Sequence, residues 1–116
     1  MNPKDDKIAA AWMAAAQDLG LGVKSPFVLH WRGREFAYPA YVPDFGREKG
    51  CLFLAIGTDH EDLRVAMATE AGYFVCRLDP DKYGTYDRQL FTDMLSDLGW
   101  LGPAPQKPSW YTGDAW

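Results

Sequence analysis

The sequence predicts an α+β protein, a two-layer sandwich with a mixed sheet and the element order α-β-β-β-α-β-α. Three observations support this prediction. Apolar residues recur at helical spacing near both ends of the chain, apolar side chains alternate with others between residues 27 and 38, and an uninterrupted apolar run over residues 51–56 precedes a second helical segment. The 116 residues suit a single domain, 1–116, with room for an apolar core.

The first helix is expected to begin after Asn2 and to end at Gly20. Asparagine is a good N-cap, and Pro3 suits the first helical position. Glycine readily adopts left-handed backbone angles, so Gly20 is expected to end the helix. One apolar stripe runs along the segment: Ile8, Trp12, Ala15 and Leu19.

Residues 25–43 are expected to form a β-hairpin. Apolar side chains alternate with others from Phe27 to Trp31, as in a half-buried strand, and Arg32-Gly33 can make the turn. Proline has no N–H to donate to a neighbouring strand. Pro39 therefore places the second strand at a sheet edge or introduces a bulge.

A strand–helix–strand unit follows. Residues 51–56 are continuously apolar, which is typical of a strand buried on both faces, and residues 73–78 are expected to form the next strand. A helix between these strands implies a parallel pair with a right-handed crossover. In an alternative interpretation, residues 64–69 form an antiparallel strand.

The intervening helix has signals at both ends. Thr58 and Glu61 have the spacing of a capping box, in which each side chain satisfies the other residue's free amide. Gly72 is expected to end the helix. The predicted apolar stripe consists of Leu63, Ala66 and Met67.

The last helix has the broadest apolar stripe, and Gly99 is expected at its C-terminal end. The stripe consists of Tyr86, Leu90, Phe91, Met94, Leu95 and Leu98. Residues 102–116 contain three prolines and two tryptophans, and the run 102–113 can form neither a helix nor a central strand. This tail is expected either to pack on the domain or to face a partner.

The charges are distributed unevenly along the chain. The net charge is −4, with five basic and three acidic residues between positions 21 and 50, and ten acidic and five basic residues between positions 59 and 114. An acidic half repels nucleic acid and attracts a basic partner. No apolar run approaches the ~20 residues that span a bilayer, and the start does not resemble a secretion signal. A cytoplasmic location without membrane contact is therefore expected.

No pattern of metal-ligating or catalytic residues is complete. Residues 79–84 begin like a calcium loop, but Tyr83 and Leu90 occupy positions that need oxygen ligands. Gly57 follows a strand, as in phosphate sites, but the acidic residues after it disfavour an anion. Neither histidine has a partner at metal-ligand spacing. We therefore expect no metal, no cofactor and no catalytic residue.

Two further groups of residues have structural interpretations. Cys51 and Cys76 lie in strand segments and are expected to be free thiols. Basic residues of two loops lie near aromatic residues, which suggests a nucleic-acid platform, but charges that protect a strand edge are the favoured interpretation. The basic residues are Arg32, Arg34, Arg47 and Lys49, and the aromatic ones are Trp31, Phe36 and Tyr38. Nucleic acid is therefore not the expected partner.

Acidic and aromatic residues gather towards the C-terminus. Asp93 and Asp97 are four residues apart on the exposed helix face, where like charges repel, and the helix dipole disfavours an acid in the last turn. Such a cost beside aromatic anchors is typical of a protein-binding surface. In an alternative interpretation the tryptophans pack the tail down, with Trp100 in the core. The candidate partner-binding residues are Asp79, Asp81, Tyr83, Asp87, Asp93, Asp97, Trp100, Trp110 and Tyr111.

Short stretches of this half resemble small bacterial immunity proteins, which neutralise the toxins of polymorphic and contact-dependent systems. The stretches are Gly72–Leu78, Tyr83–Asp87, Leu95–Trp100 and Trp110-Tyr111. The resemblance implies a non-enzymatic, antitoxin-like inhibitor that binds one toxin, which we expect to be basic. An alternative function is to bind or convert a small ligand at the sheet end near His60.

Overall fold

The computed structural model describes residues 2–43 and 49–100, and these form an α+β domain, as the sequence predicts. The predicted order gains one strand before the second helix and one short helix after the last strand. The tail, residues 102–116, lies outside the described residues. The elements are α1 (Pro3–Leu19), β1 (Phe27–Trp31), β2 (Arg34–Tyr38), β3 (Ala40–Val42), β4 (Cys51–Ala55), α2 (Glu61–Glu70), β5 (Phe74–Leu78), α3 (Pro80–Tyr83) and α4 (Arg88–Asp97).

The main sheet has the strand order β3-β4-β5 and is mixed, as predicted. β3 is antiparallel to β4, and β5 is parallel to β4. The parallel pair is joined by α2, so the crossover helix is present and the alternative strand at residues 64–69 is wrong. Because Ala55 pairs with Leu78, β4 and β5 end at the same edge of the sheet.

The strand that was expected to follow the hairpin turn is divided at Pro39. β2 pairs only with β1 in a two-stranded sheet, whereas β3 joins the main sheet. The missing proline N–H accounts for the break between them. The turn itself is confirmed: Arg32 and Gly33 have φ angles of 50° and 77°, as a two-residue hairpin turn with the twist of the strands requires.

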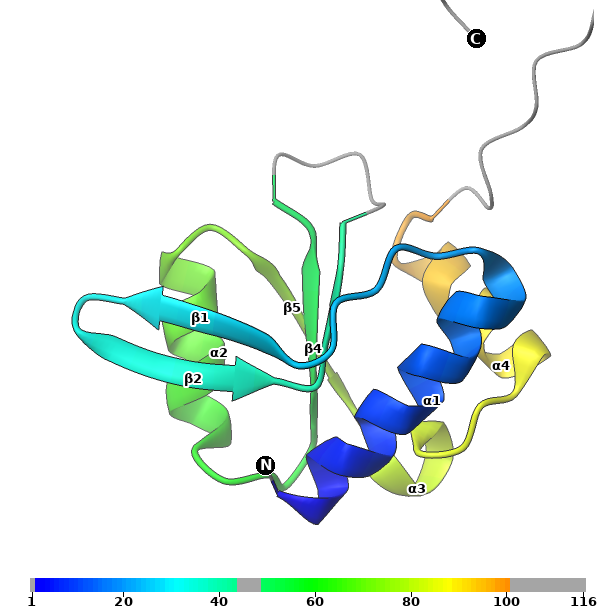
Figure 1. The fold of residues 1–116 in the computed structure, drawn as a ribbon, viewed down its shortest axis with the longest axis horizontal. Helices are drawn as coiled ribbons and strands as arrows, with labels where there is room; N and C mark the ends of the chain where they lie inside the picture. The colour runs from blue at the N-terminus through cyan, green and yellow to red at the C-terminus, as the bar shows by residue number, and fades with distance from the viewer. Residues whose placement is uncertain (1, 44–48, 101–116) are drawn as a thin grey trace, which may run out of the picture.

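Both faces of the main sheet are covered, so the elements lie in three layers where the sequence predicted two. Figure 1 shows the sheet nearly edge-on, with α1, α3 and α4 on one side and α2 and the β1–β2 hairpin on the other. All of β4 is buried. Phe53 points to the α1 side, where Trp12 packs against it at 4.3 Å between ring centroids and against Phe91 at 5.2 Å. Leu52 points to the α2 side.

The two helices on the α1 side follow their local sequence signals. The side chain of Asn2 accepts a hydrogen bond from the amide of Lys4, and Gly20 ends α1 in the left-handed conformation, with φ 70°. The apolar stripe that the sequence predicts for α1 is buried. At the end of α4 the backbone turns at Gly99, with φ 100°, and Trp100 folds back into the core with 7% of its surface exposed.

The α2 helix differs from its prediction in both its start and its buried face. It begins at Glu61, and the cap residue is His60 in the left-handed conformation, with φ 55°. The capping box is therefore wrong: Thr58 bonds elsewhere, and Glu61 accepts its hydrogen bond from Gly57 N at 2.7 Å. Leu63 is 37% exposed, whereas Arg64 is only 4% exposed.

Candidate functional site

The acidic residues that the sequence singled out lie on α3, on α4 and at the caps of these helices. All five aspartates are exposed: Asp79, Asp81, Asp87, Asp93 and Asp97. They outnumber the two basic residues of the same segment, Lys82 and Arg88. Arg88 is partly neutralised by an acid outside this segment, since its Nε lies 3.6 Å from Asp18 Oδ2. The surface formed by these residues, which we call the acidic face, thus has an excess of negative charge.

A shallow groove of about 550 Å³ runs along the acidic face. Its apolar surface comes from Tyr86 and Leu90, which the sequence assigned to the core stripe of α4. Both are only half-buried. The signal that could have revealed them is the width of that stripe, because its outermost members cannot all reach the core. The groove is lined by Lys82, Thr85, Tyr86, Asp87, Gln89, Leu90 and Asp93.

The aspartates of the acidic face have different local roles. Asp79 caps α3 by accepting from the amide of Asp81, and Asp87 caps α4 by accepting from the amide of Leu90, both at 2.9 Å. Asp93 accepts from the side chain of Gln89 at 2.9 Å. The side chain of Asp97 has no hydrogen bond or ion pair with any residue that the structure describes. Asp93 and Asp97 can therefore be changed without the loss of a helix cap.

The aromatic candidates are less accessible than the acids. Tyr83 is half-buried and its ring packs edge-on against Phe91, at 5.8 Å between centroids. Trp100 is buried, which corrects its assignment as a partner-binding residue, because the reverse turn at Gly99 returns its indole to the core. Trp110 and Tyr111 lie outside the described residues.

Tyr86 is an aromatic residue that lines the groove. Its hydroxyl donates a 2.5 Å hydrogen bond to Asp18 Oδ2 at the end of α1. Burial and this bond raise the pKa of Tyr86 to about 12, because the proton is held between the phenol and a carboxylate. The bond joins α1 to the segment before α4 and holds the Tyr86 ring in place at the groove.

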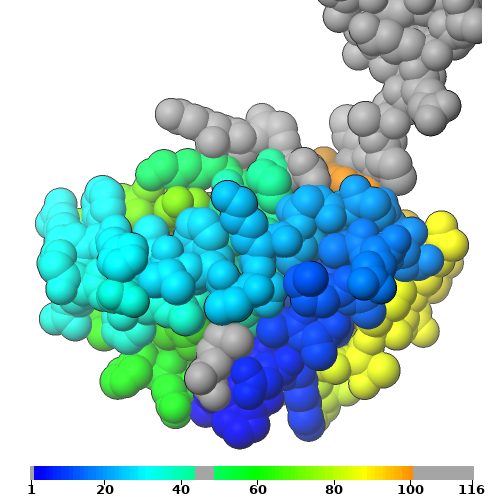
Figure 2. Space-filling model, in the orientation of Figure 1, coloured from blue at the N-terminus to red at the C-terminus, as the bar shows by residue number. Residues whose placement is uncertain are grey.

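A second hollow, a cleft of about 450 Å³, lies where α1, α2 and the hairpin meet. Figure 2 shows these three elements side by side on one face, in dark blue, green and cyan. His60, around which the sequence placed an alternative site, belongs to this cleft and is exposed. The lining residues are Asn2, Pro3, Asp5, Phe36, Ala37, Asp59, His60 and Arg64.

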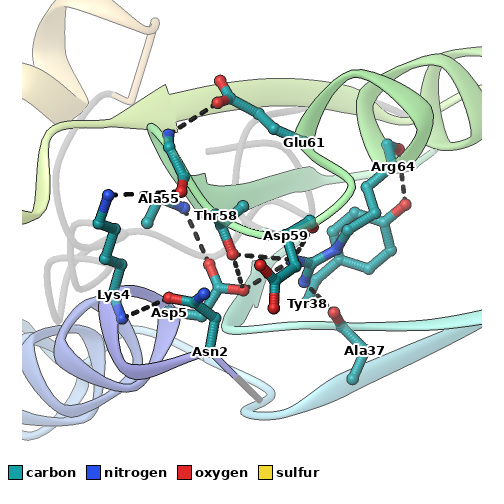
Figure 3. Close-up of polar contacts among 11 residues, drawn as sticks. Asn2, Lys4, Asp5, Ala37, Tyr38, Ala55, Thr58, Asp59, Glu61 and Arg64 are labelled. Atoms are coloured by element: carbon teal, nitrogen blue, oxygen red, sulfur yellow. Dashed lines mark hydrogen bonds and ion pairs between the residues drawn. The ribbon is translucent and has the colours of Figure 1, made fainter.

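A buried ion pair forms the base of the cleft (Figure 3). Arg64 Nη1 lies 2.7 Å from Asp5 Oδ2, and both side chains are almost fully buried. Asp5 also accepts from Ala55 N at 3.0 Å and from the hydroxyl of Thr58 at 2.7 Å. These bonds connect the first turn of α1 to the end of β4 and to α2. Every oxygen of the Asp5 carboxylate is thus used within the protein.

Arg64 is held on its other side by β2. Its Nη2 donates to the carbonyl of Ala37, and its guanidinium carbon lies 5.1 Å from the centroid of the Tyr38 ring. The Tyr38 hydroxyl donates in turn to the carbonyl of Arg64, at 2.6 Å. Burial raises the pKa of Tyr38 to about 12, and the nearby Arg64 charge opposes that rise. Arg64 Nε has no hydrogen-bond partner among the described residues.

Sequence reasoning missed this ion pair, although a signal for it exists. Asp5 was assigned to the first turn of α1 because of the helix dipole, but it precedes Ile8 by three residues and so continues the buried stripe. Arg64 similarly lies three residues before the buried Met67. An acid on one buried stripe and a base on another would have indicated a pair.

Two of the four basic loop residues, Arg32 and Lys49, bond near the C-terminal end of α2, whereas Arg34 is exposed. Arg32 forms an ion pair with Glu70 at 2.8 Å, and Lys49 donates to the carbonyl of Ala71. Tyr38, proposed as part of a stacking platform, is fully buried. Arg47 lies outside the described residues.

The remaining candidate features are the two cysteines, possible metal ligands and membrane-spanning helices. Cys51 and Cys76 are not joined in a disulfide, as predicted, and burial raises the pKa of Cys76, which lowers its thiolate fraction. Among residues 2–43 and 49–100 no group of His, Cys, Asp and Glu side chains could hold a metal ion. None of the helices in the same residues is long and apolar enough to cross a membrane.

Comparison with protein-family models, with curated proteins and with solved structures finds no match to this chain.

Proposed function

We propose that this protein is a non-enzymatic inhibitor of the immunity type, which acts in the cytoplasm and neutralises a basic toxin through its acidic face. The observation that carries the proposal is the groove along α3 and α4, in which carboxylates border a half-buried tyrosine and leucine. Such a surface combines long-range attraction for a basic partner with apolar contact area. The resemblance of short stretches of the sequence to immunity proteins agrees with this function.

The charges of α4 support a binding role over a stabilising one. The helix has no acidic residue in its first turn and no basic residue in its last turn, and Asp97 lies at the negative end of the helix dipole. Asp93 and Asp97 also repel each other, at a cost of a few tenths of a kcal/mol. Lysine in place of Asp97 alone would stabilise the helix better, because it would attract Asp93 and suit the helix dipole. A partner that needs the carboxylates explains why the less stable arrangement is present.

The proposal is tested with a charge-reversed double variant, Asp93→Lys with Asp97→Lys. The test begins with a search for the partner: the product of the adjacent gene is coexpressed with the inhibitor, and a protein that copurifies with it is used for the rate measurements. We expect the association rate constant to fall about tenfold at low salt, because electrostatic steering is lost. The free energy of unfolding should stay nearly the same, since two lysines four residues apart repel each other as the aspartates do, while a positive charge in the last turn of α4 suits the helix dipole.

A matched control separates the acidic face from net charge. Glu35→Lys with Asp62→Lys changes the net charge from −4 to 0, as the test variant does, but alters the hairpin and the start of α2. We expect this control to reduce the association rate less than threefold. Equal losses in both double variants, or no loss in either, would contradict a specific role of the acidic face.

A further inference from the structure

The cleft beside His60 lies where parallel sheets commonly place ligand sites. β4 and β5 are parallel and end at the same edge, and the loop after β4 brings Asp59 and His60 to the mouth of the cleft. Ligands of α/β sheets bind outside the carboxyl ends of the parallel strands, because the connecting loops converge there. The first turn of α1 and the strand β2 supply the other walls.

The electrostatic character of the cleft is set by Asp59. The charges of Asp5 and Arg64 neutralise each other at 2.7 Å, and both side chains are nearly inaccessible. Asp59 is exposed, and no basic side chain of the described residues forms an ion pair with its carboxylate. Its backbone carbonyl, not its side chain, accepts from Arg64 Nη1, at 3.4 Å. The lining therefore carries one uncompensated negative charge at the mouth of the cleft.

Two rings form the wall next to this carboxylate. The ring centroids of Phe36 and His60 are 5.7 Å apart, with their planes at 45°. The side chain of His60 makes no capping hydrogen bond to α2, and the Phe36 ring is only half-buried. An aromatic wall beside a carboxylate suits a flat cation, because the ring faces and the carboxylate both attract positive charge.

We propose that this cleft binds a small planar cation, an aromatic amidine or amine, with its charged group beside Asp59 and its ring beside Phe36 and His60. The volume of about 450 Å³ accommodates a ligand of one or two rings. The Asp59 charge disfavours an anion of the same shape. The site is separate from the acidic face on α3 and α4 and does not depend on the function proposed for that face.

The test is an NMR titration of the ¹⁵N-labelled full chain with three probes of one shape. Benzamidine is the planar cation, benzamide its neutral counterpart and benzoate the anion. We expect benzamidine to shift the amide signals of Phe36, Asp59 and His60 and to bind at least about fivefold more tightly than benzamide, the effect of one charge pair near 4 Å in water. Benzoate should bind more weakly than benzamide.

Variants of the protein test whether the preference for benzamidine over benzamide comes from the Asp59 carboxylate. Asp59→Asn should abolish the preference for benzamidine over benzamide, and Phe36→Leu should weaken both probes. Asp62→Asn is the matched control, because the Asp62 side chain is 100% exposed in the first turn of α2 and does not line the cleft. It should retain the preference. Equal affinities of benzamidine and benzamide, signal shifts outside the cleft, or an equal loss in Asp62→Asn would each overturn the proposal.

Discussion

The buried ion pair between Asp5 and Arg64 offers a quantitative test of how α1 is joined to the rest of the fold. Asp5→Leu removes the carboxylate and leaves the Arg64 charge buried without its partner, which costs about 3–5 kcal/mol. Because the amide of Ala55 and the hydroxyl of Thr58 also lose their acceptor, the cost should lie at the upper end of this range. Arg64→Met should cost less, about 2–3 kcal/mol, because Asp5 keeps both of those donors.

The double variant Asp5→Leu with Arg64→Met measures the interaction between the two residues. It leaves no unpaired charge in the interior, so its cost should be smaller than the sum of the two single costs by about 2–4 kcal/mol. Urea unfolding followed by circular dichroism gives the three free energies. If Asp5→Leu does not fold, Asp5→Asn replaces it, because the amide oxygen can still accept from Ala55 while the charge is removed.

Additive single costs would refute this reasoning. A coupling energy below about 0.5 kcal/mol would mean that the two charges do not depend on each other, as for separate surface residues. The base of the cleft would then not be a neutralised pair, and the excess charge at its mouth could not be assigned to Asp59 alone.

Three further predictions concern the core, the pH dependence and a close backbone contact. Trp100→Ala should lower the free energy of unfolding by about 3 kcal/mol, because the indole is buried. A melting temperature that changes by less than about one degree would contradict this buried position. The raised pKa of Tyr38, about 12, means that its contribution to stability is complete below pH 10 and is lost as the pH rises towards 12. Urea midpoints measured from pH 9 to 11.5 should therefore fall more steeply in the wild type than in Tyr38→Phe, and parallel curves would contradict the assignment. Gly84→Ala should destabilise by about 1–3 kcal/mol, since the added Cβ would lie 2.2 Å from the carbonyl oxygen of Pro80; an unchanged unfolding midpoint would show that the turn between α3 and α4 has room for it.

The parts of the fold that were predicted correctly have signals within a few residues of where they act. The cap at Asn2, the left-handed end at Gly20 and the turn at Arg32-Gly33 each depend on the conformational preferences of adjacent residues. The buried stripe of α1 follows directly from helical spacing. The acidic face was predicted for a similar reason, since its aspartates are polar residues on exposed helix positions and need no distant partner.

Predictions that required a distant partner were less accurate. The capping box at Thr58 has the correct local spacing, but the hydroxyl bonds to Asp5, 53 residues away, and the helix begins two residues later than the box implies. For the same reason, Arg64 lies on the buried face of α2, where the sequence had predicted Leu63. A hydrogen-bonded ion pair in the interior outweighs the burial of one leucine side chain, because a buried charge without a partner is far more costly.

The α+β class, the mixed sheet, the ends of α1 and the exposed acids of α4 could be predicted from the sequence, because these features depend on local propensity and on the pattern of apolar residues. Three-dimensional packing was needed to show that Asp5 meets Arg64, 59 residues away, that Trp100 is a core residue and that Tyr86 borders a groove on the acidic face. The cleft beside His60 likewise exists only where α1, α2 and the hairpin meet. Such features require three-dimensional packing, since the burial of a polar or aromatic side chain is fixed by the elements that cover it and not by its neighbours in the chain.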